Sequence, residues 1–73
     1  MTVFVLEWVD IAQTRASVFK TFEGAKNAVK YLFDAYDVHV DFERDYQVHY
    51  VFFNKDEDKY ACECWIYEAE LED

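Results

Sequence analysis

Proline is absent from this sequence, and glycine occurs only once, at Gly24. Loop-rich and disordered chains are rich in both residues, so their scarcity argues against those classes. Long apolar runs are also missing, since no stretch approaches the roughly 20 residues of a membrane-spanning helix. The first residues, MTVFVLEW, contain no basic side chain, which argues against a secretory signal peptide. These absences predict a compact cytoplasmic domain of regular elements joined by short connections.

Groups that carry catalysis or bind metals are few. Cys62 and Cys64 are the only cysteines, and on a strand they would point the same way, roughly 6.6 Å apart. That separation is too long for a local disulfide, and the spacing is not the C-x₂-C of structural zinc sites. His49 should point to the opposite face of the sheet, across from Glu63. We therefore expect free, buried thiols and a surface pair of histidine and carboxylate.

No combination of residues predicts an enzyme. The sequence has one serine, Ser17, and three threonines, none in a nucleophile or phosphate-binding motif. Its acidic stretches lack the glycine and the bidentate glutamate of a calcium-binding loop. We predict no catalytic residue, no metal ligand and no cofactor.

The length predicts a single domain, residues 1–73, of limited stability. A chain of this length buries only about 60% of the surface that its unfolded form exposes. Seven Phe, six Tyr and two Trp are hard to enclose in one core of this size. We expect some of these rings at the surface, where they mark an interface with another molecule.

The negative charge lies almost entirely in the second half of the chain. Residues 1–33 hold three acids and four bases, a net charge of +1, whereas residues 34–73 hold thirteen acids and three bases, a net charge of −10. One interpretation is a solvated surface that keeps an aromatic-rich protein from aggregating. The other is a recognition surface for a basic partner. Direct binding to nucleic acid is disfavoured, because phosphate contacts need Lys and Arg.

The hydrophobic pattern predicts an α+β fold of order β-β-α-β-β. Thr21 is a suitable N-cap for a helix over residues 22–36, in which apolar residues recur every three or four positions. Alternation and apolar runs predict strands over residues 2–9, 15–20, 38–42, 46–53 and 59–68, with turns at 10–14 and 54–58. Residues 38–53 fit either one long bent strand or two strands. The single helix should pack on one face of an antiparallel sheet.

The other face of this sheet has no predicted cover. The alternating pattern places Val51, Phe53, Trp65 and Tyr67 on it. A sheet face that carries aromatic side chains and lacks a covering helix favours a homodimer or a partner-binding surface.

Three carboxylates alternate along the segment after the helix. On one strand face, Asp41, Glu43 and Asp45 would be spaced about 6.6 Å apart, against about 3.4 Å for successive phosphates of one DNA strand. Such a ladder imitates the charge of a phosphate backbone, though the match in spacing is loose. The alternative is that an edge strand carries charge to prevent pairing between sheets.

Seven acidic residues of the second half make up what we call the acidic cluster: Asp37, Asp41, Glu43, Asp45, Asp56, Glu57 and Asp58. With the size and aromatic content of the whole chain, this cluster resembles small phage-encoded inhibitors of bacterial defence systems, which include anti-CRISPR proteins and DNA mimics. Such proteins share no fold or motif, so the resemblance carries over no site residue. It implies a partner class, a basic nucleic-acid-handling protein whose groove is blocked in the host cytoplasm.

We therefore predict a non-enzymatic acidic protein that inhibits its partner by blocking a basic nucleic-acid-binding site. The predicted partner-binding residues combine the acidic cluster with three aromatic anchors: Asp37, Asp41, Glu43, Asp45, Tyr46, Asp56, Glu57, Asp58, Trp65 and Tyr67. No direct contact with nucleic acid or membrane is expected. The alternative is a structural or adaptor module that homodimerises through its aromatic sheet face.

Overall fold

The computed structural model describes residues 1–9 and 14–72, which form one sheet and one bent helix. The strands are β1 (Thr2–Val9), β2 (Thr14–Phe19), β3 (Tyr36–Arg44), β4 (Gln47–Asn54) and β5 (Tyr60–Glu70). The helix consists of α1 (Phe22–Val29) and α2 (Leu32–Ala35). The predicted element order and the α+β class are confirmed. The turn predicted at 10–14 lies outside the described residues except for its last position.

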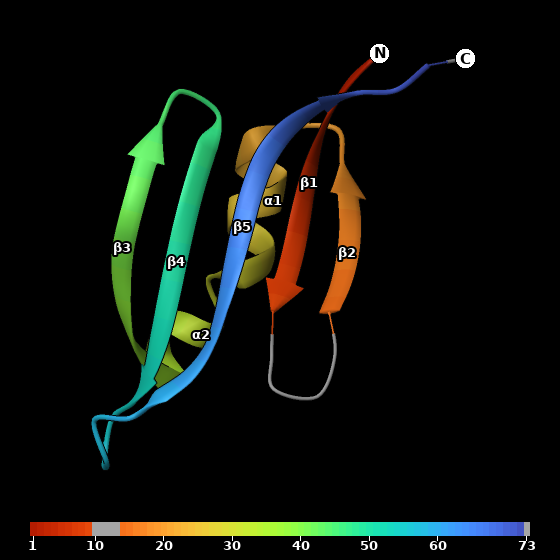
Figure 1. The fold of residues 1–73 in the computed structure, drawn as a ribbon. Helices are drawn as coiled ribbons and strands as arrows, with labels where there is room; N and C mark the ends of the chain where they lie inside the picture. Colours follow the sequence, from red (N-terminus) through yellow and green to blue (C-terminus); the bar gives the residue numbers. More distant parts are fainter. Residues whose placement is uncertain (10–13, 73) are drawn as a thin grey trace.

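The sheet is antiparallel throughout, with the strand order β2-β1-β5-β4-β3. The hairpins β1-β2 and β3-β4 flank β5, so the last strand of the sequence occupies the middle of the sheet (Figure 1). β1 pairs with β5 along its whole length, from Thr2 opposite Glu70 to Val9 opposite Glu63. The amino group of Met1 lies 3.0 Å from Oε1 of Glu70. The beginning and the end of the described chain therefore lie side by side.

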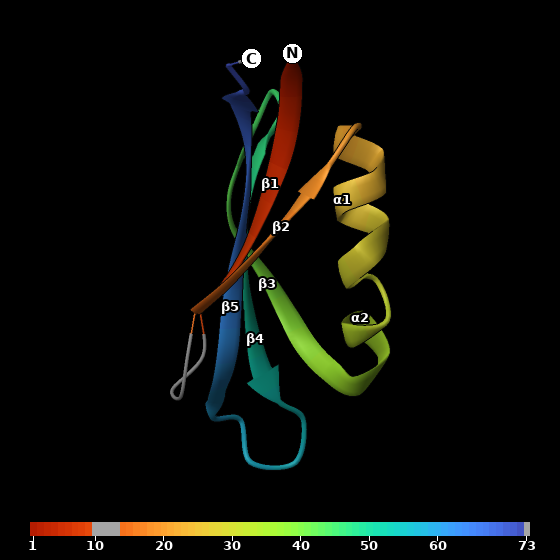
Figure 2. The same cartoon turned by 90° about the vertical axis from the view of Figure 1, so that its right-hand side faces the viewer.

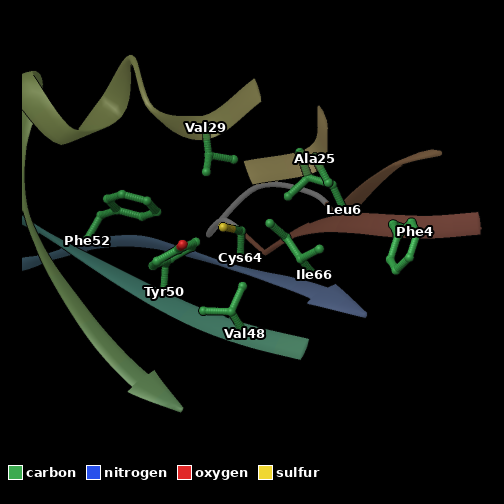
Figure 3. Packing of buried hydrophobic residues seen from close by; sticks show 9 residues of the cluster. All are labelled: Phe4, Leu6, Ala25, Val29, Val48, Tyr50, Phe52, Cys64 and Ile66. Carbon is green, nitrogen blue, oxygen red and sulfur yellow. The ribbon is translucent and has the colours of Figure 1, made fainter. Parts of the chain in front are cut away.

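One face of the sheet is covered by the helix and carries the core (Figure 2). The core side chains come from α1 and from alternate positions of β1, β4 and β5: Phe4, Leu6, Ala25, Val29, Val48, Tyr50, Phe52, Cys64 and Ile66. Figure 3 shows Val29 projecting from α1 towards the side chains of the strands, with Phe52 and Cys64 beneath it. Full burial of an aliphatic or aromatic side chain contributes about 1.5–3 kcal/mol, so this cluster is the main source of stability.

Helix α1 begins at the predicted N-cap. Thr21 has an extended backbone (φ −131°, ψ 152°), and its Oγ1 accepts a hydrogen bond of 2.9 Å from the N–H of Gly24. A Cβ at position 24 would lie 2.9 Å from the same oxygen and 3.9 Å from the ring of Phe19. The missing side chain of Gly24 therefore makes room for the hydroxyl that caps the helix.

The helix predicted over residues 22–36 is bent and ends one residue early. It is interrupted at Lys30, whose carbonyl accepts a hydrogen bond of 3.0 Å from the N–H of Phe33 in a tight turn. Beyond the bend, the ring of Phe33 packs on Tyr50 and Phe52, with ring centroids 5.4 and 6.1 Å apart. Aromatic packing against the sheet thus accompanies the departure from a straight helix.

Residues 38–53, which fit one bent strand or two, form two strands joined by a turn at Asp45 and Tyr46. Tyr46 has a φ of 58°, a left-handed conformation that costs a non-glycine residue about 1–2 kcal/mol. Its ring packs on Phe4 and Phe22, each with 5.8 Å between ring centroids. These ring contacts oppose the strain and hold the turn in this conformation.

Candidate functional site

The sheet face opposite the helix has no described element over it, and we call it the open face (Figure 2). It carries the side chains that alternate with the core positions of the strands. Val51, Phe53, Trp65 and Tyr67 lie there, as the alternation predicts. Each is half-buried by its neighbours in the sheet. The open face is therefore an aromatic surface formed by strands alone.

His49 lies on β4 in the open face and is enclosed by three side chains. Its Nδ1 lies 3.1 Å from Oδ2 of Asp41, and its Nε2 lies 2.9 Å from Oε2 of Glu63. Its ring stacks on Trp65, with 3.9 Å between ring centroids and the planes 4° from parallel. Only 7% of the residue is exposed. The contact with Glu63 is confirmed, but Trp65 rather than Glu63 lies opposite His49, and the histidine is buried rather than at the surface.

The two carboxylates decide what the His49 ring can do. An ionised carboxylate only accepts hydrogen bonds, so a ring nitrogen that faces it must donate. The imidazolium form donates from both nitrogens, whereas a neutral ring donates from one and turns a lone pair towards the other carboxylate. Because Asp41 and Glu63 occupy both nitrogens, neither is available to take a proton from a substrate.

Asp41 reaches His49 because β3 contains a bulge. Val40 lies opposite Tyr50, and the next pair along the two strands is Phe42 opposite His49. Asp41 therefore has no opposite residue on β4. An inserted residue of this kind bends the strand and redirects a side chain. Here it turns the Asp41 carboxylate towards the imidazole on the open face.

The bulge also separates the three carboxylates predicted to form a ladder. Glu43 lies opposite Val48, a core residue, so Glu43 is on the helix side of β3 while Asp41 faces the open side. Asp45 belongs to the turn that follows the strand. The prediction that all three share one strand face is wrong, because one inserted residue reverses the alternation of every later position.

A further carboxylate of the open face is held by a tyrosine. Tyr67 Oη donates a hydrogen bond of 3.0 Å to Oε2 of Glu7, and this bond raises the pKa of the tyrosine above its usual value, with burial adding to the effect. Glu7 lies opposite Trp65 in the pairing of β1 with β5. Three carboxylates near the indole, those of Glu7, Asp41 and Glu63, thus each have a fixed polar partner.

Four of the predicted partner-binding residues share the open face. Trp65 and Tyr67 lie on β5, Asp41 lies at the bulge, and Asp37 lies on β3 opposite Phe53. Asp37 and Asp41 are exposed. The structure therefore brings the predicted acidic and aromatic residues together on one surface at these positions.

The remaining predicted partner-binding residues lie in two turns at opposite ends of β4. Asp45 and Tyr46 precede the strand, and Asp56, Glu57 and Asp58 follow it. Its eight residues span about 25 Å, so the two turns cannot form one cluster. The ring of Tyr46 also packs towards the helix side, against Phe4 of the core and the partly buried Phe22 of α1.

Each of these turns borders a shallow depression. The first, of about 350 Å³, is lined by Asp45, Tyr46, Gln47, Tyr67 and Glu68. The second, of about 380 Å³, is lined by Ala35, Asn54, Lys55, Asp56 and Glu57. Tyr67 connects the first depression to the open face, so the acidic surface continues from the sheet onto the β3-β4 turn.

Sequence reasoning missed Glu7 and the enclosure of His49. Glu7 is the single charge inside an apolar strand, and such a charge usually has a hydrogen-bonding partner. That signal is readable from the sequence. The contact between Asp41 and His49 depends on the bulge, and no residue type in this segment predicts a bulge.

In the part of the chain that the structure describes, no group of three or more His, Cys, Asp or Glu could hold a metal ion. Cys62 and Cys64 form no disulfide, and burial raises the pKa of the Cys64 thiol to about 12. No helix within residues 1–9 and 14–72 is long and apolar enough to cross a membrane. The chain matches no family model, no curated protein and no solved structure.

Proposed function

We propose that this chain is a non-enzymatic binding protein that docks its open face on a basic surface of a nucleic-acid-handling protein in the cytoplasm. Docking there would block the nucleic-acid site of the partner. The observation that carries the proposal is the set of three carboxylates held near Trp65 on a face without a covering layer: Glu7, Asp41 and Glu63.

Fixed carboxylates are well suited to bind cationic side chains. A carboxylate that is already held by a hydrogen bond or ion pair loses little freedom when a partner docks, which lowers the entropic cost of association. A tryptophan beside carboxylates also suits arginine, whose guanidinium group stacks on aromatic rings and pairs with carboxylates. Surfaces that bind nucleic acid are rich in Arg and Lys, so their chemistry complements that of the open face.

The charge of the whole chain also favours a basic partner. The net charge is −9, and acidic turns lie at both ends of β4, beyond the carboxylates of the open face. A field of one sign steers an oppositely charged partner and accelerates association, with a strong dependence on salt. The acidic surface therefore supports rapid docking on a basic groove.

The geometry of His49 supports a positioning role over catalysis. A general base needs a nitrogen within hydrogen-bond reach of the proton that it abstracts. Both ring nitrogens face carboxylates, and the residue is almost fully buried. Its contacts instead hold Asp41 and Glu63 in place beside the indole.

Homodimerisation through the open face, the alternative suggested by the sequence, has less support. Two copies placed face to face would set Glu7, Asp41 and Glu63 against the same carboxylates. Like charges brought together at an interface cost several kcal/mol. An arginine-rich surface removes this repulsion and replaces it with pairing.

Displacement of nucleic acid tests the proposed function. The immobilised chain captures candidate proteins from a bacterial lysate, and each is then purified and bound to a fluorescent DNA duplex. We expect the chain to release the duplex from at least one of them, less effectively as salt rises from low to physiological concentration. Capture without release of the duplex would contradict the proposal.

Two variants with the same change in charge locate the contact. E7Q/E63Q removes two carboxylates of the open face, and the control E23Q/D34N removes two exposed carboxylates of the helix. We expect the first variant to weaken release by about tenfold or more and the second to weaken it much less. Equal weakening would mean that only total charge matters. Circular dichroism and thermal unfolding check that both variants fold.

A further inference from the structure

The two edges of the sheet are built differently. β3, at one edge, has the bulge and three carboxylates, those of Asp37, Asp41 and Glu43. Bulges and charges keep an edge strand from pairing with another chain. β2, at the other edge, pairs with β1 in an unbroken register and contains no carboxylate. One edge is therefore protected against pairing and the other is not.

The outer side of β2 is open. Among the described strands only β1 pairs with it, and Figure 1 shows β2 at the right-hand edge of the sheet. Its residues from Thr14 to Val18 are exposed, and Val18 keeps 59% of its surface accessible. A regular exposed edge offers a row of backbone N–H and C=O groups to a further strand. β2 is thus ready to accept one.

β2 itself also lacks the negative charge of the rest of the chain, and the carboxylate opposite it on β1, that of Glu7 across from Ala16, is hydrogen-bonded to Tyr67 of β5. No carboxylate occurs in the sequence between Asp10 and Glu23, whereas Arg15 and Lys20 lie in or next to the strand. Two copies of a chain with a net charge of −9 repel each other least where their carboxylates are farthest apart. Of the two edges, β2 is the one that a second copy can approach.

We propose that two copies of this chain pair through their β2 strands, antiparallel and about a two-fold axis, so that two five-stranded sheets form one continuous sheet. A two-fold contact sets the same strand against itself and needs no second kind of surface. Small subunits also gain from such contacts, because a domain of this length has a limited core of its own.

The alternation of side chains limits the register of this pairing. Opposite residues of an antiparallel pair share a sheet face. One residue of β2 must therefore lie at the two-fold axis, directly opposite the same residue of the second copy. Ala16 and Ser17 lie in the middle of the strand, and their small side chains allow close approach at the axis. With Ala16 at the axis, Arg15 lies opposite Ser17 of the second copy, and with Ser17 at the axis it lies opposite Phe19. In neither register does Arg15 face Arg15.

The pairing has a consequence for the open face. A two-fold axis perpendicular to the sheet keeps both helices on one side and both open faces on the other. The dimer would present two such faces side by side to one extended partner. The pairing itself is independent of the proposed function, because it needs no basic partner.

Sedimentation equilibrium of the unmodified full chain tests the pairing. We expect the mass to rise with concentration to twice the 8.8 kDa of the chain and no further. Backbone amides of β2 should exchange their hydrogens more slowly as concentration rises, since the new ladder protects them. This second measurement needs no variant, so it decides the matter even where a substitution prevents folding.

Two matched variants identify the edge involved. V18E places a carboxylate on β2, and V40E places one on β3 at a valine of similar exposure, 52% against 59%. We expect V18E to raise the dissociation constant of the dimer by about tenfold or more, and V40E to change it little. The proposal is overturned by a monomer at every concentration up to about 1 mM, by equal effects of the two variants, or by assembly beyond a dimer. A dimer that W65A dissociates and V18E leaves intact would also overturn it.

Discussion

The imidazole of His49 lies flat against the indole of Trp65, with 3.9 Å between ring centroids and 4° between the ring planes. The stacked pair joins β4 to β5 on the face that the helix does not reach. Carboxylates from β3 and β5 lie against the two ring nitrogens of the imidazole. Side chains from three strands thus form a small cluster around the buried His49, outside the main core, and they order an otherwise uncovered surface.

His49→Ala should reduce the free energy of unfolding by about 1–3 kcal/mol, because Asp41 and Glu63 lose a buried hydrogen-bonding partner. His39→Ala is the matched control. His39 is exposed on β3 and contacts Phe53 with 4.8 Å between ring centroids, so we expect a loss within about 0.5 kcal/mol. Urea unfolding measures both. Similar losses would show that the enclosure of His49 adds nothing to stability.

Gly24→Ala should leave stability nearly unchanged, although alanine is the better helix former by about 1 kcal/mol. The new Cβ would lie 2.9 Å from Oγ1 of Thr21 and displace the cap, which is worth about 1 kcal/mol. Thr21→Ala removes that oxygen and makes room. In this background Gly24→Ala should stabilise by about 1 kcal/mol, so the two changes are coupled. Additive effects in a double-mutant cycle would contradict the proposed clash.

Tyr46→Gly should be more stable than Tyr46→Ala by about 1 kcal/mol, because glycine adopts the positive φ of 58° without strain. Both variants lose the ring contacts with Phe4 and Phe22 and should be less stable than the parent chain by about 1 kcal/mol or more. Thermal unfolding ranks the three proteins. Equal stability of the two variants would mean that the turn relaxes to negative φ once the ring is removed.

Alkaline pH should destabilise the fold, chiefly through Cys64. Burial raises the pKa of its thiol from 9.0 to about 12, so within that window the unfolded chain has lost a proton that the folded chain keeps. The free energy of unfolding therefore falls as pH rises through the window, and this thiol has no effect well below it. Burial also raises the pKa of Tyr50, which acts in the same direction.

Urea unfolding at a series of pH values from about 8 to 11 measures this fall. Cys64→Ala is less stable at every pH because it leaves a cavity, but its free energy of unfolding should decline less steeply with pH. A decline of the same slope in both proteins would assign the alkaline effect to other groups.

Much of the fold is readable from local patterns. The apolar run over residues 2–9 predicts β1 with its observed bounds, and the Thr21 cap predicts the start of α1. The strand order is not local information. Pairing of β1 with β5 joins residues as far apart as Thr2 and Glu70, and neither segment alone indicates its neighbour. The bend at Lys30 likewise accompanies contacts of Phe33 with rings far along the chain, those of Tyr50 and Phe52.

The open face is likewise predictable only in part from the sequence. Alternation along β4 and β5 places Trp65 and Tyr67 correctly, because regular strands keep a period of two. The prediction for Asp41 and Glu43 fails at the bulge, where that period is interrupted. A bulge depends on how a strand fits its neighbour rather than on residue type, so the contact of Asp41 with His49 could not be predicted from the sequence.

The central position of β5 has a consequence for synthesis. Translation produces this strand after the other four, yet both hairpins pair with it and two core residues, Cys64 and Ile66, lie on it. Before it leaves the ribosome, the chain contains two hairpins without a strand to join them, and isolated hairpins are marginally stable. Closing the long loop between β1 and β5 is entropically slow. The sheet should therefore form only after β5 has been synthesised, and until then the two nascent hairpins have no strand that joins them.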